Sequence, residues 1–441
     1  MGRPAFRKIF RCCWGPGWSA AAAALAFAAA SCGDDSDSTP EPTPTPDASS
    51  EQDAAPDDDA EAGISDVTDA SESEAAVPTK ATFQVDQSLD IATVATGHLA
   101  FPDMTRLPDG RILLVYRQGA KHVDNSGRIM KQYGTSDALT WTAPEVLYDE
   151  EGIDDRDPSV ATLANGDVWV NYFQYKTYAL TDGTMSAHHI FAARSTDQGK
   201  TFGAFVQVNP GSMAPSNPKL NAEGRWVDDT DTELFVQASS SALLELGGEL
   251  VVPSYGGYPL NLKDLAHCPK SWITLYKSVD GQSWAEEPVA FGATTTWLQE
   301  PALLRLASGR VLMHVRTATG STPSNPGKMK QAVSTDEGAT WSALEDFPFV
   351  GHAPELAQMK SGLLLTAYRE LNDAYTQEWV SFSWSLDDGD TWSEPVRVQD
   401  CGASECGYPA ILELEGQRFV LAYYAPGGKA IKAALYQYSL E

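Results

Sequence analysis

The chain has 441 residues, of which 42% are hydrophobic and 21% charged, and its formal net charge is −29. This is the composition of a globular protein, so disorder throughout the chain is excluded. The acidic excess repels a phosphate backbone, so nucleic acid is not expected as a partner. The 12 Trp, 16 Tyr and 35 Gly residues favour short strands and turns, and hence an all-β fold.

Residues 1–31 have the pattern of an export signal. A basic start is followed by Ala20 to Ala30, an apolar run too short to span a bilayer. The run ends in Ala29-Ala30-Ser31-Cys32-Gly33, which resembles a bacterial lipobox. This resemblance implies a lipid on Cys32 and anchoring in the bacterial cell envelope, at a membrane or the cell surface. The alternative is ordinary cleavage nearby, with Cys32 as an incidental thiol.

Residues 32–80 are predicted to form a disordered tether. From Gly33 to Lys80 the chain consists almost wholly of Asp, Glu, Ser, Thr, Pro and Ala, with 15 acidic residues against Lys80 alone. Such a segment has too little apolar surface to fold, and its charges repel one another. About half of the net charge therefore belongs to the tether. We expect one folded domain over residues 81–441.

Three cysteines remain in the predicted domain. Cys401 and Cys406 lie five residues apart in Cys-Gly-Ala-Ser-Glu-Cys, and an oxidising compartment favours a local disulfide between them. Two free thiols or a metal pair are the alternative, but no His-rich segment lies near in sequence, so no zinc site is predicted. Cys268 is left as an odd thiol.

A turn phrase recurs through the domain. It reads Ser/Thr-x-Asp, a Gly-containing turn, then Thr/Ser and an aromatic residue. Its copies are Ser195 to Phe202, Ser334 to Trp341 and Ser385 to Trp392, with shorter versions at Thr135 to Trp141 and Ser278 to Trp284. The Asp is expected to accept backbone hydrogen bonds, and the Gly to take the left-handed conformation. The phrase is therefore interpreted as structural.

A second phrase, Pro followed five residues on by Leu or Met and eight on by Gly, defines the repeating unit. It begins at Pro102, Pro158, Pro301 and Pro354, and more loosely at Ser241 and Pro409. Six units of strand, turn, strand and hairpin match the four-stranded blades of a six-bladed β-propeller. The sixth unit lacks a turn phrase of its own, so Ala81 to Val94 is expected to supply its outermost strand and close the ring.

The repeated turns resemble the Asp-boxes of the sialidase (neuraminidase) superfamily, whose members are six-bladed propellers with BNR repeats. The resemblance covers residues 81–441 and implies the fold more directly than the chemistry, because Asp-boxes also occur in other glycosidases and in non-catalytic propellers.

Three arginines occupy one position of the repeat. Fifteen residues after the Pro position stand Arg117, Arg316 and Arg369, in units one, four and five. Because the second strand of a blade returns to the same rim, we expect these arginines to converge and to bind an anionic substrate by bidentate hydrogen bonds. The alternative is that each arginine pairs with an acidic neighbour and joins adjacent blades.

The residues that precede two of the prolines resemble catalytic residues. The segment from Gln299-Glu300-Pro301 to Arg316 is similar to the sialidase segment with the catalytic Glu, and Gly407-Tyr408-Pro409 to that with the nucleophilic Tyr. The resemblance implies Tyr408 as nucleophile and Glu300 as its base, a pair that does not set a carboxylate nucleophile against a substrate carboxylate. The alternatives are a packed strand tyrosine and an inter-blade salt bridge.

The loop that leaves the first unit's second strand holds the predicted acid. Asp124 is the candidate by resemblance, although it also has the sequence context of a turn cap. His122 shares or replaces this role, or is simply a surface histidine. Arg156 and Asp157 add charge to the rim and are predicted to contact substrate, unless Arg156 only neutralises its neighbouring carboxylates.

One departure limits the resemblance: sialidases begin the first unit with Arg-Ile-Pro, and this chain has Ala100-Phe101-Pro102. The first hypothesis is an exo-glycosidase that removes a terminal anionic sugar, sialic acid or a similar one, from glycans. The alternatives are a non-catalytic carbohydrate-binding propeller and a glycosidase or lyase for another acidic sugar. No metal ligand or cofactor is assigned, a structural calcium ion is left open, and the oligomeric state is not predicted.

Overall fold

The computed structural model describes residues 78–180, 183–209, 219–220, 226–227, 230–231, 236–257, 271–293, 296–319, 326–372 and 374–441. The predicted signal peptide, Cys32, nearly all of the tether and Cys268 lie outside these residues. The described part is built from β-strands and one short 3-10 turn, η2 (Pro426–Gly428), so the predicted all-β class is confirmed. It contains no helix long and apolar enough to cross a membrane.

Antiparallel sheets follow one another along the chain. The first pairs β2 (His98–Arg106), β3 (Ile112–Gly119), β4 (Arg128–Gly134) and β5 (Glu145–Tyr148) in that order. The next pairs β6 (Asp154–Thr162), β7 (Val168–Leu180), β8 (Gly183–Ser195) and β9 (Val206–Gln207) in the same way. In both groups, strands that are consecutive in the chain pair with one another, as the repeat predicts.

The middle of the chain continues this pattern with local irregularities. The third group contains β12 (Val236–Ala238), β13 (Leu244–Leu246), β14 (Glu249–Gly257), β15 (Ser271–Ser278) and β16 (Ala285–Ala293). Both β12 and β13 pair with β14, and β12 also pairs in parallel with β8. A separate two-stranded ladder joins β10 (Lys219–Leu220) and β11 (Trp226–Val227).

One long strand belongs to two successive groups. The fourth group is β17 (Thr296–Arg305), β18 (Val311–Thr319), β19 (Lys328–Ser334) and the first part of β20 (Glu345–Gln358). From Gly351 onward, β20 pairs instead with β21 (Leu364–Leu371), which is followed by β22 (Glu378–Ser385) and β23 (Val396–Gly402). The outer strand of one group therefore continues directly into the first strand of the next.

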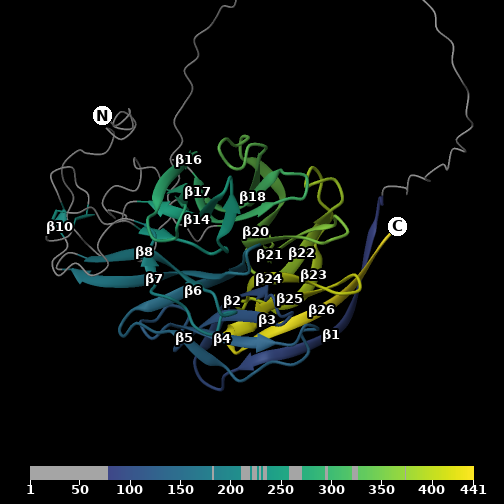
Figure 1. The fold of residues 1–441 in the computed structure, drawn as a ribbon, viewed down its shortest axis with the longest axis horizontal. Helices are drawn as coiled ribbons and strands as arrows, with labels where there is room; N and C mark the ends of the chain where they lie inside the picture. Colours follow the sequence, from purple (N-terminus) through teal and green to yellow (C-terminus); the bar gives the residue numbers. More distant parts are fainter. Residues whose placement is uncertain are drawn as a thin grey trace, which may run out of the picture. The chain divides into compact units, whose positions relative to one another are not determined.

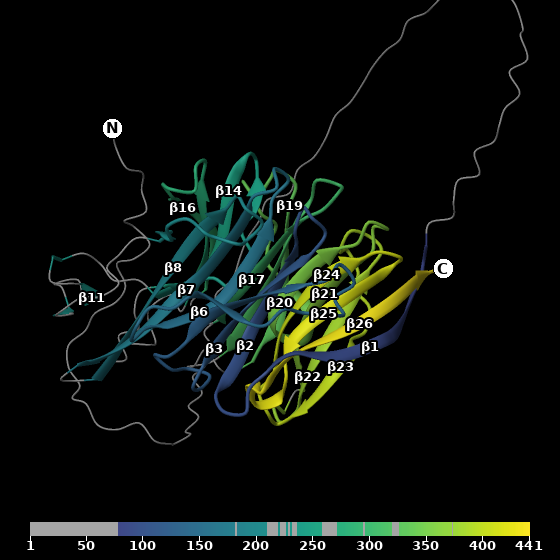
Figure 2. The ribbon, with the colours of Figure 1, turned by 60° about the horizontal axis from the view of Figure 1, so that its bottom comes forward.

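The last sheet joins the two ends of the described chain. It contains β24 (Gly407–Leu414), β25 (Arg418–Tyr424), β26 (Ala430–Leu440) and β1 (Ala81–Thr93). The antiparallel register of β1 and β26 runs from Ala81 opposite Leu440 to Thr93 opposite Ala430, and the two strands lie side by side in Figures 1 and 2. The predicted role of residues 81–94 as the outer strand of the last unit is thus confirmed.

The first and last sheets also share a hydrophobic core. Leu99 and Leu114 of the first sheet lie in one buried cluster with Val420 and Ala433 of the last. Burial of this apolar surface favours contact between sheets that are far apart in sequence. The contact places the loops that follow β3 and precede β24 near one another.

A β-bulge recurs at the proline of each regular unit. The strand register shifts around Pro102, Pro158, Pro301, Pro354 and Pro409. At each bulge the residue before the proline has a positive φ angle, and these residues are Phe101, Asp157, Glu300, Ala353 and Tyr408. A bulge redirects a side chain out of the alternating pattern of its strand, so the repeat gives these five side chains a common direction.

The turn phrase makes the predicted hydrogen bonds. In the copy at Ser334 to Trp341, Asp336 accepts hydrogen bonds from the backbone N of Thr340 at 2.8 Å and from its hydroxyl at 2.6 Å. Gly338 has φ 81°, and its carbonyl accepts a hydrogen bond from the Trp341 indole at 3.1 Å. These contacts hold the hairpin at the outer end of its sheet and do not involve the bulge residues.

Candidate functional site

The bulge residues of different sheets meet around one small cavity. Its lining includes the residues before four of the prolines, namely Phe101, Asp157, Ala353 and Tyr408, together with Ser240 of the less regular third unit. Residues at the same repeat position, on strands far apart in the sequence, therefore line one cavity. This common position is the basis of the candidate site.

Tyr408 and Glu300 are in direct contact in the site. The Tyr408 hydroxyl donates a hydrogen bond to Glu300 Oε1 at 2.6 Å, and Arg316 Nη1 donates to the same oxygen at 2.6 Å. The second carboxylate oxygen accepts the backbone N–H of Ala353 at 2.8 Å. Glu300 is only 3% exposed, so its charge depends on these donors. Burial, followed by the nearby charges of Glu300 and Asp157, raises the pKa of Tyr408 well above its ordinary value.

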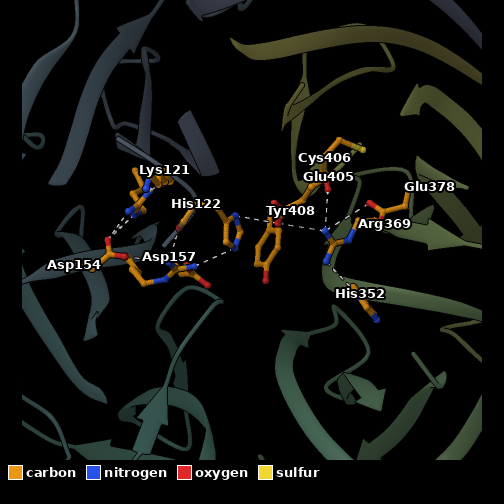
Figure 3. A network of polar contacts seen from close by, with 12 residues as sticks. Lys121, His122, Asp154, Asp157, His352, Arg369, Glu378, Glu405, Cys406 and Tyr408 are labelled. Carbon is orange, nitrogen blue, oxygen red and sulfur yellow. Dashed lines mark hydrogen bonds and ion pairs between the residues drawn. The ribbon is translucent and has the colours of Figure 1, made fainter. Parts of the chain in front are cut away.

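Arg369 lies beside the tyrosine ring. Its guanidinium carbon is 5.8 Å from the centroid of the Tyr408 ring, and its Nη2 is 3.1 Å from His352 Nδ1. Its Nη1 lies 3.7 Å from a carboxylate oxygen of both Glu378 and Glu405 (Figure 3). Burial and the adjacent arginines lower the pKa of His352, which therefore accepts from Arg369 as a neutral ring. Arg369 Nε is buried without a hydrogen-bond partner among the described residues, which leaves a donor at the site.

Asp157 is a buried carboxyl group with incomplete hydrogen bonding. It is 4% exposed, and its Oδ1 has no hydrogen-bond partner among the described residues. The Nε of Arg156 lies 3.8 Å from this oxygen, beyond hydrogen-bond distance. Burial raises the pKa of Asp157 to about 7; the Arg156 charge opposes this change and the Glu300 charge adds to it. Such a carboxyl group exchanges a proton near neutral pH.

Arg117 does not join the other two arginines, which lie at Glu300 and Tyr408. It is 0% exposed, and its Nε and Nη2 both lie 2.7 Å from Asp154 Oδ1. Its Nη1 donates to the carbonyl oxygen of Lys121 at 2.8 Å, so the loop after β3 folds back over the guanidinium group. A Cβ at Gly127 would lie 1.7 Å from Asp154 Oδ1, so this close approach requires glycine. The expected convergence of three arginines is thus reduced to Arg316 and Arg369, and Arg117 has the alternative role of a buried ion pair.

Asp124 has the geometry of a turn cap. Its Oδ1 accepts the backbone N–H of Ser126 at 2.9 Å, and hydrogen bonds from Ser126 lower its pKa. A carboxyl group that is ionised in this way is a poor proton donor at neutral pH. The structure therefore favours the capping alternative over the acid role expected from the resemblance.

His122 and Arg156 are linked on the wall of the site. Arg156 Nη1 donates to the His122 carbonyl oxygen at 2.6 Å and to Asp154 Oδ2 at 3.1 Å. His122 Nδ1 lies 2.9 Å from Glu405 Oε1. The ring of Phe101 contacts two side chains, with centroid distances of 5.4 Å to the His122 ring and 4.6 Å to the Tyr408 ring. His122 and Arg156 thus form part of the wall. Arg156 also neutralises its neighbouring carboxylates, which is the alternative role that the sequence suggested.

Three site residues were not identified from the sequence. Tyr255 is close enough for the charges of Glu300 and Asp157 to raise its pKa further, after burial. Tyr255 precedes Gly256, which lies fifteen residues after Ser241, the start of the less regular third unit. This repeat position could have identified Tyr255 from the sequence. Glu378 and Glu405 carry no repeat signal, because they lie at a strand start and in a loop.

The loop before Tyr408 is covalently closed. The structure pairs Cys401 with Cys406, which is the pairing the sequence predicts. Gly407, with φ 121°, follows the disulfide, and a Cβ there would lie 2.9 Å from Arg369 Cβ. The disulfide and this glycine together position Tyr408 against Arg369.

Comparison with known proteins agrees with this architecture. The BNR repeat-like domain model matches residues 110–420. No curated protein sequence matches the chain significantly.

Among solved structures, a protein of unknown function from Dyadobacter fermentans has a TM-score of 0.64 at 20% identity, covering 80% of this chain and 99% of that one. The GH93 α-L-arabinofuranosidase of Fusarium graminearum has 0.55 at 14%, covering 80% and 97%. The NanB sialidase of Streptococcus pneumoniae has 0.53 at 13%, covering 80% and 70%. The likeness is one of fold, which in the two glycosidases is a β-propeller. Because the family model spans most of the sequence, the chain belongs to the BNR repeat-like domain family.

Proposed function

We propose that the protein is a retaining glycoside hydrolase that removes a terminal anionic sugar from glycans, on a closed six-bladed propeller with Asp-box turns. The observation that carries this proposal is the 2.6 Å hydrogen bond from the Tyr408 hydroxyl to Glu300 Oε1. A tyrosine hydroxyl is a weak nucleophile until a base removes its proton, and Glu300 is positioned as that base. The sheet order and the pairing of β1 with β26 support the closed propeller.

In the proposed reaction, Tyr408 Oη attacks the anomeric carbon while its proton passes to Glu300. The bond to the leaving group breaks, and the departing oxygen takes a proton from the acid. Water then cleaves the tyrosyl glycoside: its oxygen bonds to the anomeric carbon and keeps one proton, its other proton restores the acid, and Tyr408 Oη recovers its proton from Glu300. Arg316 stabilises the charge of Glu300 before the proton moves.

We assign the acid to Asp157 rather than to Asp124. Asp157 lines the cavity, and its raised pKa keeps it protonated up to about pH 7, whereas the pKa of Asp124 is lowered by its turn contacts. An efficient general acid has a pKa near the working pH.

Arg316 and Arg369 favour an anionic sugar as substrate. Arg316 contacts Glu300, Arg369 lies beside the Tyr408 ring, and a planar guanidinium suits a carboxylate. A second candidate is a glycosidase for a sugar other than sialic acid. It is favoured by Ala100, which stands where sialidases have the Arg of Arg-Ile-Pro, and by the ion pair of Arg117 with Asp154.

The test is release of fluorophore from three aryl glycosides, of sialic acid, glucuronic acid and arabinofuranose. The purified protein is compared with Tyr408→Phe and with Tyr438→Phe, whose hydroxyl contacts Ser361 elsewhere. Release that is lost only in Tyr408→Phe supports the assignment, and the preferred glycoside identifies the sugar. Failure with all three, combined with binding on a glycan panel, would favour the carbohydrate-binding alternative.

We also propose that the protein is a lipoprotein of the bacterial cell envelope, anchored through Cys32. The support is the sequence pattern of residues 20–33 followed by the acidic segment. Labelling with a fatty-acid analogue in a bacterial host should modify the wild type and spare Cys32→Ser. Equal labelling of both proteins would contradict the anchor.

A further inference from the structure

Two histidines and a glutamate form a cluster beside the candidate site. His98 lies at the start of β2, His122 in the loop after β3, and Glu405 in the loop before β24. One donor atom from each residue lies within 4.8 Å of the others. None of these three residues carries a step of the proposed glycosidase reaction.

The His98 ring is built into its position. It is 8% exposed, and its Nδ1 has no hydrogen-bond partner among the described residues. Gly428, with φ 64°, makes room for it, since a Cβ there would lie 2.3 Å from the ring. A buried polar atom without a partner carries a desolvation cost that a ligand removes.

The other two residues are held by their own loops. The His122 carbonyl oxygen accepts from Arg156 Nη1 at 2.6 Å, which fixes the backbone of its loop. The Glu405 carbonyl oxygen accepts the backbone N–H of Gly427 at 3.0 Å, and the neighbouring Cys406 is closed by the disulfide. His122 Nδ1 and Glu405 Oε1 are already 2.9 Å apart. The three donors are therefore preorganised.

We propose that His98, His122 and Glu405 bind one divalent transition-metal ion of the zinc type. Two imidazoles and one carboxylate are a common donor set for such ions, and three protein ligands leave a fourth position for water. Calcium is disfavoured because it prefers a shell of oxygen ligands. The ion would join the first sheet to the loop that enters the last sheet, next to the shared core of these sheets.

Two neighbouring arginines limit the affinity of this cluster for a divalent metal ion. Arg369 Nη1 lies 3.7 Å from Glu405 Oε1, and Arg156 Nη2 lies 3.4 Å from His122 Nε2. These positive charges oppose a divalent cation. The distance from Arg156 Nη2 to His122 Nε2 is long for a hydrogen bond, so this contact does not require Nε2 to be the unprotonated nitrogen of the His122 ring. We therefore expect saturable binding that is weaker than at a site without neighbouring cations.

The test is isothermal titration of the chelator-treated protein with zinc chloride, paired with Co²⁺ absorption spectra. We expect one saturable site and cobalt d–d bands, with affinity reduced at least about tenfold in His122→Ala and in Glu405→Gln, as for loss of one ligand. Glu415→Gln, an exposed carboxylate elsewhere, is the matched control. The thermal unfolding midpoint should rise with zinc concentration in the wild type and the control only.

The two variants are chosen because neither His122 nor Glu405 is fully buried, whereas a substitution of His98 risks misfolding. No saturable binding would overturn the proposal. Unchanged binding in both variants would also overturn it, since the ion would then occupy another site. Because titration and unfolding are measured without a sugar substrate, the result is independent of the proposed glycosidase activity.

Discussion

The hydroxyl of Tyr408 and Oε1 of Glu300 are 2.6 Å apart, although the residues are separated by 108 positions in the sequence. Both residues precede the proline of their repeat and have a positive φ angle. The contact therefore arises because two copies of one local bulge face each other across packed sheets.

Replacement of Glu300 by Gln should remove the base and leave the fold intact. Because Gln has nearly the same shape and keeps one of the two acceptor oxygens that Arg316 and Ala353 use, we expect kcat to fall by about 10²- to 10⁴-fold with a small change in KM. Steady-state kinetics on the best aryl glycoside measure this effect, with Glu415→Gln as the control. Wild-type kcat in Glu300→Gln would exclude Glu300 as the base.

The pH dependence of turnover should follow Asp157. Its pKa is raised to about 7 by burial, so the protonated acid is lost as the pH rises through 7. We expect kcat on a glycoside with a poor leaving group to fall above pH 7 in the wild type and to be low and flat in Asp157→Asn. The defect should be smaller with an activated aryl leaving group, which needs less proton donation.

Asp155→Asn is a matched control for Asp157. Burial also raises the Asp155 pKa to about 7, but its oxygens accept hydrogen bonds from Glu150 N and Gln174 Nε2, both at 2.8 Å. If the alkaline decline in kcat disappears in Asp155→Asn and persists in Asp157→Asn, the assigned acid is wrong.

Stability should depend on the same carboxyl group in a direction fixed by its pKa. The folded pKa of Asp157 exceeds its ordinary value of 3.8, so its contribution to folding is fully present below about pH 4 and is lost as the pH rises through 7. Asp157→Asn should therefore raise the thermal midpoint more at pH 8 than at pH 4. Calorimetry at both pH values measures this, and equal shifts would contradict it.

Arg117 should matter for stability rather than for substrate binding. Its replacement by Met leaves Asp154 buried with fewer partners, and loss of one member of a buried ion pair costs about 3–5 kcal/mol of unfolding free energy. Denaturant unfolding measures this loss. The folded fraction should keep the wild-type KM, and a KM increase at unchanged stability would instead support a contact with substrate.

The turn aspartates should contribute to acid sensitivity. Hydrogen bonds from Thr340 lower the pKa of Asp336 to about 2, so its stabilising effect is present above pH 3.8 and is lost as the pH falls toward 2. The difference in unfolding midpoint between the wild type and Asp336→Ala should therefore shrink from pH 5 to pH 2. A constant difference would show that the ionised carboxylate is not responsible.

The repeats made the strand organisation predictable. The turn phrase and the proline phrase depend on local backbone conformation, so they identified the hairpins, the strand order and the contact of residues 81–94 with the last sheet. They also placed Glu300 and Tyr408 at one repeat position, because residues at equivalent positions of similar units point the same way.

Only the tertiary structure distinguished residues that share a sequence position. Arg117, Arg316 and Arg369 are equivalent in the repeat, but the loop after β3 encloses Arg117 with Asp154, whereas Arg316 contacts Glu300 and Arg369 lies over Tyr408. The raised pKa of Asp157 likewise depends on burial by several strands.

His98, His122 and Glu405 come together because the first and last sheets are in contact, and no spacing in the sequence predicts this cluster. Local conformation is determined by neighbouring residues, and so the sequence by itself determined the units. Burial and charge at the site depend on which units pack together, which is a property of the folded chain.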